Sequence, residues 1–223
     1  MLVNSNFQSD SPFDAPNWRA AETQIIKGSL FVGSQSQVMQ DWEQPLMRRL
    51  AQFATLQGGR VLEVGFGLGI SAAEIMNCGC EEYVVIEAHP EIAARARTWG
   101  AQQRIPVRIF EGFWQNVIHE VGRFDGVLFD VYAVNDISGD NNYRRFLPLA
   151  HQVLRPNGGV TYFSGETRKF DSDHIEFLLS HFGEVNFAIV DGLYPPPECR
   201  YWKHDHMVVP YVKRPLVGLA NSN

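Results

Sequence analysis

Residues 60–71 read Arg-Val-Leu-Glu-Val-Gly-Phe-Gly-Leu-Gly-Ile-Ser. The apolar run 61–64 stops at three glycines on alternate positions, and a helix-compatible stretch, 70–76, follows directly. We therefore expect a strand, a tight turn and a helix. Glycines remove Cβ atoms where a ligand must touch the backbone, and a helix N-terminus presents unpaired N–H groups. The carboxyl end of such a strand is where open α/β sheets bind ligands.

The spacing of the glycines indicates the kind of ligand. Gly65, Gly67 and Gly69 form Gly-x-Gly-x-Gly, which lacks the spacing of the dinucleotide fingerprint Gly-x-Gly-x-x-Gly. Glu63 precedes the glycines, and Glu87 ends the next apolar run, about one βαβ step later. Together they resemble motif I and the ribose-binding acid of a class I S-adenosylmethionine-dependent methyltransferase. The alternative is a turn without a ligand, although a bare turn rarely needs three alternating glycines.

Composition narrows the function classes. The chain has 223 residues, of which 45% are hydrophobic and 20% charged, and this fits one globular domain. A formal charge of -6 and a pI near 5.6 argue against a nucleic-acid surface and suit neutral or cationic small substrates. Three cysteines are too few for a disulfide framework or a zinc site. Residues 1–14 lack the features of a signal peptide, and no apolar run approaches a membrane span.

We therefore expect a cytoplasmic protein, monomeric or homodimeric, with a small-molecule substrate and without metal, nucleic-acid or membrane partners. Periodicity predicts helices over 37–53, 90–100, 141–154 and 175–182. Strands are expected over 82–87, 107–110, 124–130, 160–163, 185–190 and 207–212, with a Pro-Asn-Gly-Gly turn before the fourth of these. These elements predict an α/β fold with a mostly parallel seven-stranded sheet, an antiparallel last strand and helices on both faces.

Two carboxylates stand at positions that favour a cationic substrate. Asp130 ends a buried strand beside the first strand, and Glu43 lies between Met39 and Met47 on one face of the predicted helix. A surface glutamate beside core methionines is the alternative for Glu43, and a helix N-cap is the alternative for Asp130. On its own, Trp18 would be a core anchor. His204 and His206 form a structural pair, because no third metal ligand is near in sequence.

Four segments resemble guanidinoacetate N-methyltransferase: Val-Met-x-x-Trp-Glu-x-Pro-x-Met at 38–47, Gly-Gly-Arg-Val-Leu-Glu-Val-Gly-Phe-Gly at 58–67, Phe-Asp-Gly-x-Leu-x-Asp at 124–130 and Pro-Pro-x-x-Cys-Arg-Tyr at 195–201. The resemblance spans about residues 18–213. It implies a Rossmann-like class I methyltransferase domain over 37–223, with residues 1–36 covering the active site. It also implies N-methylation of a small guanidino compound.

The resemblance assigns roles to matching positions. S-adenosyl-L-methionine, with S-adenosyl-L-homocysteine as its product, would contact Trp18, Met39, Met47, Glu63, Gly65, Phe66, Gly67, Leu68, Gly69, Ile70, Ser71, Glu87, Ala88, His89, Trp114, Gln115 and Asp130. The substrate would contact Trp18, Glu43, Asp130, Gly165 and Glu166. A guanidinium is planar, forked and weakly nucleophilic, so two carboxylates suit it. Asp130 would act as the base, and Glu43 would hold and polarise the other nitrogens.

One segment departs from the family pattern. Where the family has a small apolar residue followed by threonine, residues 162–167 read Tyr-Phe-Ser-Gly-Glu-Thr. The carboxylate of Glu166 would repel that of guanidinoacetate, which favours agmatine or arginine as the acceptor. A shift of one position would instead put Thr167 in the family's place.

Four other functions stay open at this point. The first is a class I methyltransferase of an unrelated small amine or hydroxyl compound. The second is a nicotinamide-dependent oxidoreductase, which the glycine spacing disfavours. The third is a binding module that keeps the pocket without catalysis. The fourth is a protein arginine methyltransferase, for which 223 residues leave little room for a peptide-docking extension.

Overall fold

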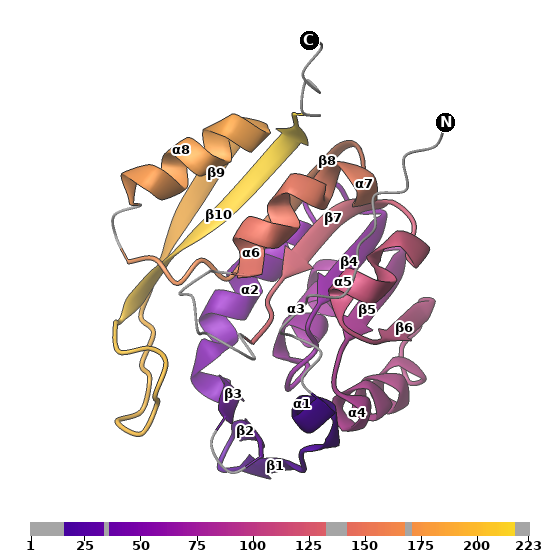
Figure 1. Cartoon of the computed structure of the whole chain (residues 1–223), viewed down its shortest axis with the longest axis vertical. Coiled ribbons are helices and arrows are strands. Elements are labelled where there is room, and N and C mark those ends of the chain that lie inside the picture. The colour runs from indigo at the N-terminus through magenta and orange to yellow at the C-terminus, as the bar shows by residue number, and fades with distance from the viewer. Residues whose placement is uncertain (1–15, 34–35, 133–141, 168–170, 217–223) are drawn as a thin grey trace.

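The computed structural model describes residues 16–33, 36–132, 142–167 and 171–216. These residues form a seven-stranded sheet in the order β6-β5-β4-β7-β8-β10-β9 (Figure 1). Its strands are β4 (Arg60–Val64), β5 (Glu82–Glu87), β6 (Val107–Glu111), β7 (Phe124–Phe129), β8 (Leu154–Tyr162), β9 (Phe182–Asp191) and β10 (His206–Pro215). Strand β10 is antiparallel to both β8 and β9, whereas β4 to β8 pair in parallel. The predicted sheet is confirmed.

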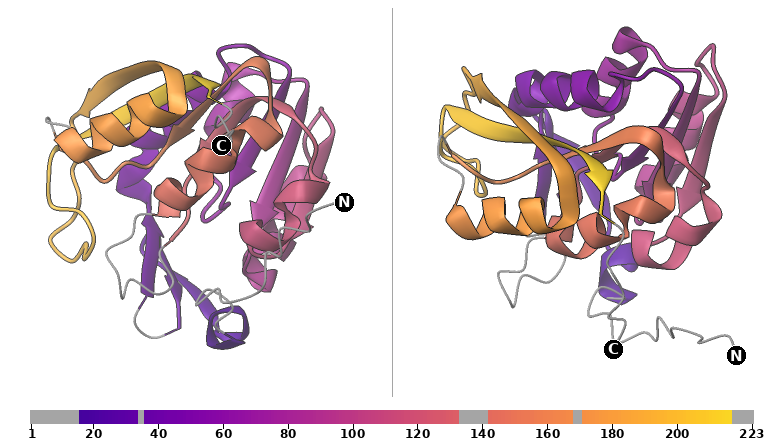
Figure 2. Two further views of the ribbon diagram at one scale, coloured as in Figure 1. Left: turned by 45° about the horizontal axis from the view of Figure 1, so that its top comes forward. Right: turned by 90° about the horizontal axis from the view of Figure 1, so that it is seen from above.

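Helices cover both faces of this sheet, as predicted. One face packs on α2 (Gln44–Ala54), α3 (Ile70–Cys78) and α4 (Pro90–Gly100). The other packs on α5 (Trp114–Val117), α6 (Asn142–Phe146), α7 (Ala150–Val153) and α8 (Ser172–His181), with the 3-10 turns η2 (Ile118–Glu120) and η3 (Leu147–Leu149). Figure 2 shows α2, in purple, and α8, in orange, on opposite sides of the strands. Because both faces are covered, the central strands β4, β5 and β7 are mostly apolar.

The predicted helix over 37–53 is wrong in its first part. Residues 36–40 form β3 (Ser36–Gln40), which pairs with β2 (Ser29–Val32), and η1 (Asp41–Glu43) follows before α2 begins. Pro45 lies in the first turn of α2, where its missing N–H costs nothing. In the interior of a longer helix, the same proline would remove a hydrogen bond. The predicted four-residue spacing of the methionines around Glu43 on one helix is therefore not formed.

Two further boundaries differ from the prediction. The expected helix over 141–154 is divided into α6, η3 and α7, with Pro148 in η3. The Pro-Asn-Gly-Gly turn lies inside β8 rather than before it, because Leu154 already pairs with Phe124. Gly159 then pairs with Gly126, so the turn forms an irregularity in the strand, with φ of Asn157 at +68°.

A three-stranded sheet of β1 (Thr23–Ile26), β2 and β3 lies at one end of the molecule, beside α1 (Pro16–Ala20) and α4 (Figure 1). Arg19 on α1 donates to the carbonyl of Ala88 at 3.1 Å and to Glu111 at 2.9 Å. Thr23 donates twice to Glu91 on α4. These bonds fix residues 19–23 next to the carboxyl ends of β5 and β6. The division predicted at residues 36 and 37 falls at the start of β3.

Within the described residues, no helix combines the length and the apolar character that a membrane-crossing segment needs.

Candidate active site

The glycine turn after β4 lies between the carboxyl ends of β5 and β7. Gly65 has a φ of +93°, and a Cβ there would collide with the carbonyl oxygen of Asp130 after β7. Gly67 has a φ of +54°, and a Cβ there would lie 2.7 Å from Sδ of Met39 on β3. Gly69, at φ +78°, caps α3. Only residues without a side chain let these segments approach one turn so closely.

Glu87 ends β5 beside this turn, and backbone N–H groups hold both of its carboxylate oxygens. Phe66 N donates to Oε2 at 2.9 Å, and His89 N donates to Oε1 at 2.7 Å. Burial raises the pKa of Glu87, and these donors oppose the rise. Because the side chain also lines the cavity beside the turn, its remaining lone pairs suit a pair of neighbouring hydroxyls.

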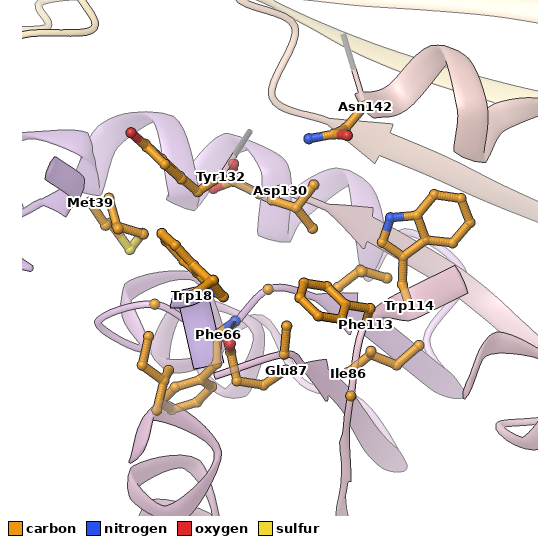
Figure 3. Close-up of a pocket in the computed structure, with 18 of the residues that line it drawn as sticks. Trp18, Met39, Phe66, Ile86, Glu87, Phe113, Trp114, Asp130, Tyr132 and Asn142 are labelled. Carbon is orange, nitrogen blue, oxygen red and sulfur yellow. Dashed lines mark hydrogen bonds between the residues drawn. The ribbon is translucent and has the colours of Figure 1, made fainter. Parts of the chain in front are cut away.

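A cavity of about 800 Å³, open to solvent, extends from the turn across the ends of the strands (Figure 3). Trp18 from α1 stacks on Tyr132, with ring centroids 5.4 Å apart and planes inclined by 7°. The residues predicted to bind the cofactor that do line this cavity are Trp18, Met39, Gly65, Phe66, Gly67, Ser71, Glu87, Ala88, Trp114, Gln115 and Asp130.

The end of the cavity near β6 is aromatic and carries one unsatisfied acceptor. Figure 3 shows Phe113 and Trp114 across the pocket from Met39. Trp114 is only 6% exposed and packs edge to face on Phe129, with ring centroids 5.8 Å apart. The buried Oε1 of Gln115 has no hydrogen-bond donor among the described residues. A flat heterocycle with an amino group fits these features, and the nearby Glu87 fits a ribose, so the cavity suits an adenosine.

Two carboxyl groups lie beside the cavity, and of the two only Asp130 is in its lining. Asp130 follows β7 and lines the cavity, and burial raises its pKa to about 7. Glu43 ends η1 and is 2% exposed, and burial together with the charge of Asp130 raises its pKa to about 8. Hydrogen bonds from the hydroxyl of Tyr201 (2.5 Å) and from Gln40 N (2.7 Å) oppose this rise. Two carboxyl groups that disfavour each other's ionisation, Asp130 half-buried in the cavity lining and Glu43 buried beside it, provide a site for one cation.

Several predicted residues lie behind this surface. Within the described part of the chain, the cavity lining does not include Glu43, Met47, Glu63, Leu68, Gly69, Ile70, His89, Gly165 or Glu166. Met47 is fully buried in the core, and Glu63 accepts a short hydrogen bond from the hydroxyl of Ser71. Leu68 N donates to Sδ of Met39 at 3.3 Å. Glu63 and Leu68 thus hold the glycine turn and the start of α3 in place without lining the cavity.

The carboxylate of Glu166 is directed toward His174 on α8. Its Oε1 lies 3.1 Å from Nδ1 of His174, whose Nε2 lies 2.6 Å from the hydroxyl of Tyr162. His174 is fully buried, and burial lowers its pKa. The side chain of Glu166 thus belongs to a polar cluster on the α8 face of the sheet. The predicted contact between Glu166 and substrate stays a prediction.

Sequence reasoning did not assign a role to several residues of the site. Val38, Val131, Tyr132 and Asn142 line the cavity, and Tyr201 contacts Glu43. Tyr132 stands two positions after Asp130, so proximity to the predicted base was a usable signal. The Cys-Arg-Tyr segment at 199–201 belongs to the resemblance, but no neighbouring residue in the sequence indicates its contact with η1.

Three kinds of comparison place this chain among known proteins. The family model described as guanidinoacetate N-methyltransferase matches residues 14–215. A protein arginine N-methyltransferase 2 from Emericella nidulans is 35% identical over 197 residues, covering 80% of this chain and 45% of the relative. One from Aspergillus oryzae is 34% identical over 139 residues, covering 59% and 32%. The chain thus spans about a third to less than half the length of these relatives.

Solved structures share the fold at low identity. The N-methyltransferase NodS from Bradyrhizobium japonicum has a TM-score of 0.56 at 16% identity, covering 78% of this chain and 97% of that one. An O-methyltransferase from Bacillus cereus in complex with SAH has a TM-score of 0.52 at 15% identity, covering 78% and 82%. The cofactor is S-adenosylmethionine, as the sequence predicted. This chain has the class I methyltransferase fold and belongs to the guanidinoacetate N-methyltransferase family.

Proposed function

We propose that this enzyme methylates a guanidino nitrogen of a small compound such as guanidinoacetate, agmatine or arginine. The observation that carries the proposal is a pair of carboxyl groups: Asp130 in the cavity lining, and the buried Glu43 with one oxygen held by Tyr201 and Gln40 N. A guanidinium that enters this site would relieve the repulsion between them. It would also present its planar N–H groups to two acceptors.

The described residues suit the cofactor's three parts. Glu87 would accept the ribose hydroxyls, Gln115 the adenine amino group, and the backbone from Phe66 to Ser71 would surround the methionine moiety. When bound, S-adenosylmethionine supplies an electrophilic methyl group on a positively charged sulfur. Asp130 lies where β7 passes the glycine turn, so its carboxylate would stand next to that methyl group.

The two carboxylates would act differently. The side-chain oxygens of Asp130 accept no hydrogen bond from the described residues, so they are available to take a proton from the guanidinium nitrogen that is methylated. A guanidinium has a pKa of roughly 13, so it is a poor nucleophile until a proton is withdrawn. Glu43 is held by two donors on one oxygen and would orient the remaining N–H groups. Orientation and proton removal together supply the catalysis.

Two stacked aromatic rings in the cavity lining support a small acceptor. Trp18 and Tyr132 stack there, and Arg19 donates to Ala88 O, just after β5, and to Glu111 at the end of β6. The tail of the acceptor would approach the segment after β8, which carries the carboxyl group of Glu166 beside the buried His174. An acidic side chain in this segment favours acceptors without a carboxylate, agmatine above guanidinoacetate.

An arginine side chain within a protein is the second candidate. Its support is the similarity, at 34–35% identity, to relatives named protein arginine N-methyltransferase 2. The chemistry at Glu43 and Asp130 would be the same, because the reacting group is the same. The difference lies in whether the cavity mouth admits a polypeptide backbone.

An acceptor screen tests both candidates. The purified chain is incubated with S-adenosylmethionine and guanidinoacetate, agmatine, arginine or an arginine-containing peptide, and release of S-adenosylhomocysteine is measured. We expect turnover with a free guanidine and its loss in Asp130→Asn. Turnover with only the peptide would select the second candidate. Turnover with only amines or hydroxyl compounds would overturn guanidine methylation.

A separate experiment tests the proposed preference for an acceptor without a carboxylate. In Glu166→Thr, guanidinoacetate should gain on agmatine in kcat/KM. If guanidinoacetate is already the preferred acceptor of the wild type, the proposed preference for a tail without carboxylate is wrong.

A further inference from the structure

We infer that Tyr201 is the positioning residue of the acceptor site, whose hydroxyl locks Glu43 so that one carboxylate oxygen stays available to the guanidinium. This inference rests on the proposed function and adds to it a residue from the far end of the chain. Tyr201 lies in the segment between β9 and β10, 158 positions from Glu43.

Both donors to Glu43 use the same oxygen. The hydroxyl of Tyr201 donates to Oε1 at 2.5 Å, and Gln40 N donates to Oε1 at 2.7 Å. The other oxygen, Oε2, accepts no hydrogen bond from the described residues, and it is not completely buried. The carboxylate therefore has one occupied oxygen and one oxygen that can accept from a ligand. A freely rotating side chain would exchange the two.

The segment that carries Tyr201 is itself attached to β3. Arg200 N donates to Oε1 of Gln37 at 2.8 Å, and Cys199 is fully buried with its N–H bonded to Pro196 O. The ring of Tyr201 also packs near that of Trp42, with centroids 6.0 Å apart. The hydroxyl is thus placed by backbone hydrogen bonds of the two preceding residues and by the packing of the Tyr201 ring, which is what a positioning role requires. A hydroxyl on a loose loop could not fix a neighbour.

Electrostatics give the hydroxyl a second effect. Glu43 is faced by Asp130 after β7, by Tyr201 and by Gln40 N; Cys199 faces Tyr201, and Glu63 faces Asp130. Burial and Asp130 raise the pKa of Glu43, whereas the two donors lower it. Of the two, only the tyrosine hydroxyl can be removed by substitution. Loss of this hydroxyl should raise the pKa of Glu43 further and lower the affinity for a cationic acceptor at neutral pH.

The test compares Tyr201→Phe with a control, Tyr211→Phe. Tyr211 lies on β10, and its hydroxyl is hydrogen-bonded to Gln57. We expect Tyr201→Phe to raise the acceptor KM about tenfold at pH 7, with a smaller effect on kcat. The acidic limb of kcat/KM should move about one pH unit upward, since one unit equals a tenfold change in ionisation. S-adenosylhomocysteine affinity and Tm should match those of the control.

A double variant locates the effect. In protein loaded with S-adenosylhomocysteine, binding of the preferred guanidine is measured against pH for Glu43→Gln and for Glu43→Gln with Tyr201→Phe. The tyrosine substitution should add less than twofold once residue 43 cannot ionise. An equal shift in both backgrounds would place the hydroxyl's action elsewhere and overturn the inference. If the acidic limb of the kcat/KM profile of Tyr201→Phe lies at the same pH as in the wild type, the inference is also overturned.

The outcome is distinguishable from failure of the proposed function. If the wild type methylates no guanidine, guanidine methylation itself is wrong. If the wild type methylates a guanidine and Tyr201→Phe behaves like Tyr211→Phe, only the positioning role is wrong.

Discussion

Binding of a guanidinium should expel protons from the active site, and the number can be worked out from the structure. Burial raises the pKa of Asp130 to about 7, and burial together with the charge of Asp130 raises that of Glu43 to about 8. The two groups titrate as a pair, and the empty pair therefore retains roughly one proton at pH 7. A guanidinium stays protonated at this pH and favours both carboxylates in their ionised form. Binding should release roughly one proton per site, and more at pH 6.5 than at pH 8.5.

Isothermal titration calorimetry measures this directly. The protein is loaded with S-adenosylhomocysteine, so that no methyl transfer follows, and titrated with the preferred guanidine in buffers of different ionisation enthalpy. The slope of observed enthalpy against buffer enthalpy gives the number of protons released. Glu43→Gln should reduce it by about half or more, because one of the two titrating groups is gone. Asp125→Asn, which alters a carboxylate bonded to Arg60 and Arg155, serves as a control.

A slope near zero for the wild type at pH 7, with measurable binding, would refute the reasoning. It would mean that both carboxylates are already ionised in the empty site, so burial and mutual repulsion do not raise their pKa values above neutral pH.

Three further substitutions test the site. Gly67→Ala, whose Cβ would lie 2.7 Å from Met39 Sδ at φ +54°, should weaken cofactor binding about tenfold by calorimetry. Gly79→Ala, with φ +95° and nothing within 4 Å, should not, and equal losses would contradict the steric argument. Asp130→Asn should abolish turnover yet raise the unliganded protein's Tm at pH 8 by at least about 2 °C. A carboxyl whose pKa is raised by folding destabilises the native state as pH rises through that value, so the gain should shrink at pH 5. Trp18→Ala, which removes a stacked ring over the cavity, should raise the cofactor's dissociation rate several-fold in stopped-flow fluorescence, whereas an unchanged rate would exclude a covering role.

Local patterns predicted the centre of the fold well. The alternating glycines, the apolar runs and the acids at strand ends are each encoded within a few neighbouring residues. A strand followed by glycines at positive φ and then a helix has few other ways to fold. Asp130 could be expected beside the turn because class I methyltransferases, which the sequence resembles, usually place this strand next to the first one. The right-handed βαβ crossover limits the possible strand orders without fixing this one.

Hydrophobic spacing predicted the structure less well where one stretch of sequence contains the end of a strand and the start of a helix. The apolar spacing over 37–53 suits a helix, but residues 36–40 instead complete a sheet with β2. Pro45 marked the true start of α2, and its position at the first turn was the available signal. Strand pairing with a preceding segment depends on a partner that helical periodicity does not reveal.

The sequence by itself determined the sheet, the cofactor turn and the acidic strand ends, because backbone preference and hydrophobic alternation act over short distances. Only the tertiary structure decided which groups face each carboxyl. It brought Tyr201 to Glu43 and turned Glu166 toward His174. Such contacts join segments that are distant along the chain, and they form only where burial makes an unpartnered polar group costly. The direction of a side chain at the end of a loop is fixed by that requirement and not by its neighbours in sequence.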